Sequence, residues 1–283
     1  MFAGFNLDTS SNLNNFNNKI IDFDNYKEMG EEHLNQQKTK CENALKSYIV
    51  DGTVDGTKLQ DDWFPGVEAD IFISHAHKDI DLAQGLAGWL HHTFGLNCFI
   101  DLNVWGYADD LLEMINSKHS DKRQDTDGGW LYDHKKCNTA SKHVNVMLSV
   151  ALQKMIDKTE ATFVLNTDNF IQKYADVTYS PWIYTEIVCT ELVRNKPLSE
   201  YRKEPITKFA HENAQQSYNA DYSAAYKVSL EHLKDINIST LCGWANNKAK
   251  YKYELDKLYL ITHPLEMKKL EKCYEKELSI LNS

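Results

Sequence analysis

Between residues 70 and 193 the chain alternates short apolar runs with longer stretches of helical period. Three runs, at residues 70–74 (DIFIS), 97–101 (NCFID) and 161–165 (ATFVL), are rich in β-branched and aromatic residues. Such short apolar runs are typical of strands buried on both faces. Helical patterns occupy residues 79–94, 108–117, 141–158 and 180–193. This alternation predicts an α/β fold with a mostly parallel sheet and helices on both faces.

The segments on either side of this core have a different character. Residues 1–25 are polar and Asn-rich, which predicts a loosely docked arm, and residues 26–49 have a helical period. After residue 195 the strand signals fade, and the rest is polar and mostly helical. We therefore predict a core at residues 68–195, an N-terminal arm and helix at 1–67, and a helical C-terminal extension at 196–283. Within the core, residues 118–138 are polar and predict a surface insertion.

Composition narrows the class of function. The net charge of -10 disfavours nucleic acid as a partner, because an acidic surface repels phosphate backbones. No run of 18 apolar residues occurs, so we expect no membrane span, and the Asn-rich start does not resemble a secretory signal. The six cysteines form no CxxC pair, which favours free thiols in a reducing cytoplasm and no zinc site.

Polar and aromatic residues follow the predicted strands. In an open α/β sheet, ligands bind beyond the carboxyl ends of the strands. Ser74 and His75 follow the first strand, and Asp101, Trp105 and Tyr107 follow the second. Together they suit a ligand that is both polar and aromatic. Two histidines in the first of these loops have no third metal ligand near them, so no metal is expected.

The helix at residues 180–193 has a well-defined start. Ser180 can cap it, and Pro181 suits the first helical position. Trp182 and Glu186 lie four residues apart and share a helix face. The indole can pack against a ligand ring, and the carboxylate can stabilise a cation that forms beside it. Cys189, on the same helix among apolar neighbours, is interpreted as a buried structural thiol.

Each of these residues also has a simpler interpretation. Glu186 can be a solvated helix carboxylate, and Trp182 can belong to the core. Asp101 can cap the end of a strand. Trp105 and Tyr107 can pack on the surface without meeting a ligand.

Several of these segments resemble the motifs of TIR domains. Residues 69–79 (ADIFISHAHKD) are similar to the first TIR motif, and residues 98–101 (CFID) resemble the second strand. Trp105-Gly106-Tyr107 takes the place of the substrate-flanking loop. Residues 180–186 (SPWIYTE) resemble the WxxxE segment of NAD-cleaving TIR proteins. The match covers less than half the chain, lacks the Pro-Gly common after the second strand, and is interrupted by the insertion at 118–138.

The resemblance implies a flavodoxin-like TIR domain that cleaves the nicotinamide–ribose bond of NAD+, with NAD+ as substrate and no cofactor. It implies a catalytic role for Glu186 and substrate contacts from Trp182, Ser74, His75, Asp101, Trp105 and Tyr107. The product would be ADP-ribose or a cyclic or modified ADP-ribose signal. Similar proteins act in bacterial antiphage systems such as Thoeris, which implies homo-oligomerisation on activation and a downstream effector that reads the nucleotide product. Two alternatives remain open: a non-catalytic TIR adaptor, and an enzyme resembling nucleoside deoxyribosyltransferases.

Overall fold

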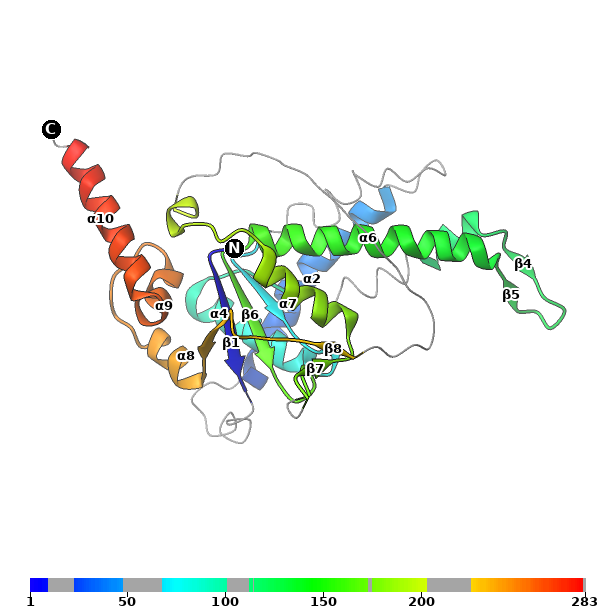
Figure 1. Cartoon of the computed structure of the whole chain (residues 1–283), viewed down its shortest axis with the longest axis horizontal. Coiled ribbons are helices and arrows are strands. Elements are labelled where there is room, and N and C mark those ends of the chain that lie inside the picture. Colours follow the sequence, from blue (N-terminus) through cyan, green and yellow to red (C-terminus); the bar gives the residue numbers. More distant parts are fainter. Residues whose placement is uncertain are drawn as a thin grey trace.

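The computed structural model shows an α/β protein with a long projecting helix and a helical C-terminal region (Figure 1). The structure describes residues 1–9, 23–47, 68–100, 112–113, 115–172, 175–202 and 225–281.

A five-stranded sheet forms the centre, and every pair of neighbouring strands is parallel. The strand order is β3-β2-β6-β1-β9. The strands are β1 (Ala3–Asp8), β2 (Ile71–Ser74), β3 (Cys98–Ile100), β6 (Ala161–Asn166) and β9 (Lys234–Ile236). The three strands predicted from the apolar runs are all present, and the α/β class with a parallel sheet is confirmed.

Residues 3–8 are not part of the loosely docked arm that was predicted for residues 1–25, and residues 10–22 of that prediction lie outside the described residues. Residues 3–8 form β1, which lies inside the sheet and pairs with β6 on one side and β9 on the other. Phe5 and Leu7 are fully buried and alternate with the less buried Gly4, Asn6 and Asp8. This period of two is a strand pattern. The sheet therefore takes β1 and β9 from segments on opposite sides of the predicted core.

Helices cover both faces of the sheet. Neighbouring residues of a strand point to opposite faces, and here both faces carry apolar side chains that the helices bury. Ile71 and Ile73 belong to a buried cluster with one set of helices, whereas Phe72 belongs to a second cluster with another. The first face carries α2 (Phe23–Ser47), α4 (Ile80–Phe94), α8 (Ile238–Ala245) and α9 (Glu254–Thr262). The second carries α6 (His134–Lys158) and α7 (Pro181–Leu192), and α10 (Pro264–Leu281) follows α9.

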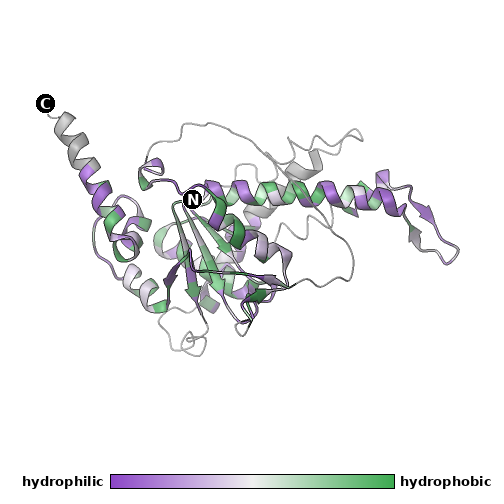
Figure 2. Cartoon of the chain, in the orientation of Figure 1, coloured by the Kyte–Doolittle hydropathy of each residue, from purple (hydrophilic) through white to green (hydrophobic). Residues whose placement is uncertain are grey.

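The predicted surface insertion is a projecting hairpin. Strands β4 (Arg123–Gln124) and β5 (Trp130–Leu131) pair at the outer end of α6, well away from the sheet (Figure 1). This end is mostly hydrophilic (Figure 2). Helix α6 begins at His134 rather than near residue 141, because the Asp133 carboxylate accepts a hydrogen bond from the Lys136 amide at 2.9 Å and caps it. Across the described ranges, no helix has the length and apolar character that crossing a membrane requires.

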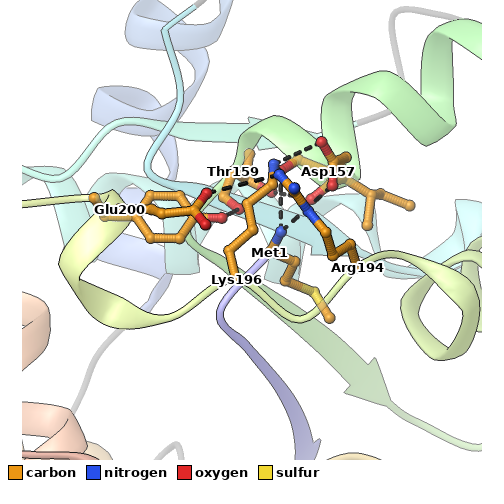
Figure 3. Close-up of polar contacts among 8 residues, drawn as sticks. Met1, Asp157, Thr159, Arg194, Lys196 and Glu200 are labelled. Carbon is orange, nitrogen blue, oxygen red and sulfur yellow. Dashed lines mark hydrogen bonds and ion pairs between the residues drawn. The ribbon is translucent and has the colours of Figure 1, made fainter. Parts of the chain in front are cut away.

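The amino ends of the central strands meet a polar cluster (Figure 3). The Met1 amino group donates a hydrogen bond to the Asp157 carbonyl oxygen at 3.0 Å, and Lys196 Nζ pairs with Asp157 Oδ2 at 2.6 Å. Burial, reinforced by the nearby Lys196 charge, lowers the pKa of the Met1 amino group to about 5. These contacts fix the start of β1 against the end of α6.

A buried ion cluster fastens α9 to the sheet. Arg202 donates hydrogen bonds to both carboxylate oxygens of Glu160, each at 2.8 Å, and its Nε donates to Asp256 Oδ1 at 3.2 Å. Glu160 directly precedes β6, and Asp256 lies in α9. The guanidinium also lies 4.3 Å from the centre of the Tyr253 ring. The bidentate geometry and the cation–π contact make Arg202 a polar link between the sheet and the C-terminal helices, beside their apolar packing.

Helices α2 and α4 approach each other through glycines. A Cβ atom on Gly88 would lie 2.1 Å from the Tyr26 carbonyl oxygen, and one on Gly30 would lie 2.0 Å from the Gln84 carbonyl oxygen. These distances are far shorter than van der Waals contact, and the atoms that would be met belong to the backbone. Glycine is therefore required for the two helix axes to come this close.

We predict that Gly88→Ala lowers the free energy of unfolding by about 1–3 kcal/mol, since the added methyl group must push α2 away from α4. Gly243→Ala is the matched control, because a Cβ there meets nothing closer than 3.9 Å. That substitution should be neutral or stabilising by up to about 1 kcal/mol, from better helix propensity. Urea denaturation followed by circular dichroism measures both. Equal effects of the two substitutions would contradict the glycine contact.

A histidine pair lies at the same helix crossing. The rings of His33 in α2 and His91 in α4 stack with their centroids 4.3 Å apart. Burial, and then the charge of His91, lowers the pKa of His33 below its usual value. The folded state thus favours neutral His33, so unfolding takes up a proton in acid.

The free energy of unfolding should therefore fall as the pH drops below about 6.5, the ordinary histidine pKa. The part of this loss that is due to His33 is complete once the pH is below the folded-state pKa of His33. His33→Asn should make the unfolding free energy less dependent on pH between 7.5 and 5.5. His119→Asn, at an exposed position beside the hairpin, is the control and should leave the dependence unchanged. A His33→Asn protein with the slope of the unmodified chain would refute this role of the pair.

Candidate functional site

The candidate site lies at the carboxyl edge of the sheet. Parallel pairing brings the ends of three neighbouring strands to the same level: Ser74 of β2 pairs with Val164 of β6, and Asp8 of β1 pairs with Asn166 of β6. Helix α7 starts after the loop that follows β6 and packs on the second face of the sheet. This edge is where open α/β sheets bind their ligands.

Glu186 and Ser74 meet directly at this edge. The Ser74 hydroxyl donates a hydrogen bond to Oε2 of Glu186. Both side chains are buried, with 0% of Ser74 and 1% of Glu186 exposed. Burying a carboxylate is unfavourable unless its charge is met by hydrogen bonds, so the serine stabilises Glu186 where it lies. The structure thus brings together two residues that the sequence nominated separately.

Local sequence explains how α7 presents Glu186. The Ser180 side chain accepts a hydrogen bond from the Ile183 amide at 3.3 Å, and Pro181 occupies the first turn. This confirms the predicted helix start. Ile183 and Ile187 anchor the helix in a buried cluster that includes Val164 of β6. Glu186 lies between these two anchors in sequence and is held against the sheet with them.

Cys189, one turn after Glu186, is a free and buried thiol, as predicted. Burial, and then the negative charge of Glu186, raises its pKa to about 12. The thiol is therefore neutral at physiological pH, and Cys189 has no character of a nucleophile.

Of the other predicted site residues, the structure describes Trp182 and His75 but not the three that follow β3. Trp182 is half-buried and packs against the apolar cluster between the sheet and α6, which favours its interpretation as a core residue. His75 is buried directly after Ser74. Asp101, Trp105 and Tyr107 lie outside the residues that the structure describes.

A second contact at this edge ties two loops together. Asp79, at the end of the loop after β2, accepts hydrogen bonds from the Thr167 hydroxyl and from Asn169 Nδ2, the latter at 2.7 Å. Thr167 and Asn169 belong to the loop that leads from β6 to α7. The polar loops expected to converge at the sheet edge are thus joined by direct contacts.

The sequence did not place β1 at this edge. The Thr9 hydroxyl, just after β1, donates to the Asn166 carbonyl oxygen at 3.2 Å. The alternation of residues 3–8 is the signal that could have found it. Within the described ranges, no group of three or more His, Cys, Asp or Glu residues is arranged to hold a metal ion.

No family model, curated protein or solved structure matches the chain. The interpretation of this site therefore depends on its own residues and on the motifs that they form.

The contact between Ser74 and Glu186 should be measurable as a coupling energy. We predict that Ser74→Ala lowers the free energy of unfolding by about 1.5–3 kcal/mol, because a buried carboxylate loses a hydrogen-bond donor. In the Glu186→Gln background the same substitution should have a smaller effect. Ser239→Ala, at an exposed position in α8, is the control and should be nearly neutral. Strictly additive effects of the Ser74 and Glu186 substitutions would contradict the contact.

Proposed function

We propose that the chain is a TIR-like enzyme that cleaves the nicotinamide–ribose bond of NAD+, with Glu186 as the catalytic residue. One observation carries the proposal: a glutamate on the helix after β6 lies buried against a serine at the carboxyl end of β2. The segments that supply these residues are the ones that resemble the first TIR motif and the WxxxE segment.

Topology supports a flavodoxin-like core. If the strands are counted from β2, then β2, β3 and β6 are the first three and lie in the order 2-1-3 across the sheet. That arrangement begins the flavodoxin-like order 2-1-3-4-5. Strands β1 and β9 take the fourth and fifth positions. The N-terminal strand thus fills a place that a later strand occupies in an unbroken flavodoxin-like chain.

A single carboxylate suits this chemistry. Nicotinamide leaves NAD+ as a neutral molecule, so no general acid is needed, whereas ordinary glycosidases use two carboxyl groups. The ribose carbon gains positive charge as the bond breaks, and a nearby carboxylate stabilises that charge. In our proposal Glu186 holds the ribose and stabilises the cation, while Ser74 keeps the carboxylate in place. NAD+ is the substrate, and no cofactor takes part.

The burial of Glu186 limits when a substrate can reach it. With 1% of its surface exposed, the carboxylate reaches a substrate only after the residues that cover it move aside, while α7 keeps its place at the sheet edge. We propose that homo-oligomerisation on activation causes this rearrangement. The cleavage would serve cytoplasmic antiphage defence in one of two ways. It would deplete NAD+, or its product, ADP-ribose or a cyclic or modified ADP-ribose, would be read by a downstream effector.

The same burial favours a second candidate, a non-catalytic TIR adaptor. In an adaptor, the pair of Ser74 and Glu186 only stabilises the fold, and no substrate needs to reach it.

The deciding experiment incubates the purified protein at high concentration with NAD+ and resolves the products by chromatography. Glu186→Gln should reduce nicotinamide release by at least about 10²-fold, since it removes the charge that stabilises the transition state. Glu191→Gln, an exposed carboxylate on the same helix, is the matched control and should retain activity.

The rate per molecule should also rise with protein concentration if assembly opens the site. A free nucleoside, tested in parallel, separates NAD+ cleavage from a deoxyribosyltransferase reaction. If the unmodified chain consumes no NAD+ even when it is concentrated, the enzyme proposal fails and the adaptor takes its place.

A further inference from the structure

Asp79 occupies the position before α4 where an aspartate normally caps a helix. It is the N-cap residue, yet its side chain makes no capping hydrogen bond to the α4 backbone. Aspartate is among the best N-cap residues because its carboxylate can accept a hydrogen bond from the first turn of the helix. Here the carboxylate takes a different partner. Its two oxygens accept hydrogen bonds from Thr167 and Asn169, 88 and 90 residues further along the chain.

Thr167 links Asp79 to the backbone of the loop after β6. While its hydroxyl donates to Asp79, the same oxygen accepts hydrogen bonds from the backbone amides of Asn169 and Phe170, each at 3.2 Å. The hydroxyl therefore closes a tight turn and fastens it to Asp79. Without Asp79 the turn loses both of these hydrogen bonds to the start of α4.

This turn also packs against α7, the helix that carries Glu186. Phe170 is 1% exposed, and with Ile171 it shares a buried cluster with Ile183 and Ile187 of α7. Ala76, from the loop that ends at Asp79, belongs to the same cluster. A displacement of the turn would therefore shift the packing of α7 and move Glu186 away from Ser74.

We propose that Asp79 is a positioning residue, which holds the turn at residues 167–171 and thereby fixes α7 and Glu186 at the sheet edge. Its catalytic consequence rests on the proposed function, but the positioning itself does not. Asp79 reaches Glu186 only through other residues and needs no contact with substrate.

Asp79→Ser separates this role from helix capping. Serine is an equally good N-cap residue, so it can support α4, but its side chain is too short to hold both Thr167 and Asn169. Asp79→Asn retains one acceptor oxygen and should be intermediate. Asp81→Ser is the matched control, because Asp81 lies two residues further on in α4, and its exposed carboxylate pairs with Lys27 instead.

Hydrogen exchange followed by mass spectrometry tests the positioning without reference to NAD+. In Asp79→Ser, amides at residues 167–171 and 182–187 should exchange at least about tenfold faster, while those at 83–94 in α4 keep their protection. If protection is lost in α4 instead, Asp79 is a helix cap, and the proposal is overturned. Unchanged exchange in the turn and α7 also overturns it.

Kinetics give the second measurement if the chain cleaves NAD+. Asp79→Ser should lower kcat by at least about tenfold with little change in KM, and Asp79→Asn should restore part of the loss. An unchanged kcat beside a loosened α7 overturns the link from Asp79 to catalysis. If the unmodified chain consumes no NAD+, the proposed function fails, and the exchange experiment still decides whether Asp79 positions α7.

Discussion

The parallel pairing of β1 between β6 and β9 is the constraint on which the rest of the structure depends. Parallel strands cannot be joined by a tight hairpin, so a central parallel strand draws its neighbours from distant parts of the chain. β1 pairs with strands that begin more than 150 residues later in the sequence. Its fully buried Phe5 and Leu7 supply part of the core on the first face. The N-terminal strand, the central segment and the C-terminal helices thus share one sheet and one buried cluster.

The same pairing shapes the candidate site. Because all five strands run in one direction, their carboxyl ends and the loops that follow them gather at one edge. Ser74, Thr167 and Glu186 come from different elements, and their contacts depend on the sheet register. A polar group buried at such an edge needs a hydrogen-bond partner from the protein, because water does not reach it. The buried Ser74 and Glu186 meet each other, and the buried Thr167 meets the half-buried Asp79.

Much of this could be predicted from local patterns. The three apolar runs, the helices predicted at residues 79–94 and 180–193 and the Ser180 cap depend on neighbouring residues, and the structure has them where they were expected. Of the helix predicted at residues 108–117, residues 108–111 and 114 lie outside the described residues. β1 was missed because its six residues adjoin an Asn-rich stretch, and composition outweighed a short alternation. β9 was missed for a similar reason: Lys234 and Asp235 are exposed at the end of the sheet, which leaves Ile236 as its one buried residue. A strand of this kind is specified by its partner more than by its own sequence.

The sequence by itself determined the α/β class, the order of the central elements and the nomination of Ser74 and Glu186, because periodicity and capping are properties of short segments. Only the tertiary structure decided that the two residues touch, that the half-buried Trp182 packs against an apolar cluster and that Asp79 ties the turn at residues 167–171 rather than capping α4. The physical reason is that each of these side chains has more than one possible contact partner. An aspartate before a helix can accept a hydrogen bond from its own backbone or from a distant loop, and the sheet register determines which of the two is within reach.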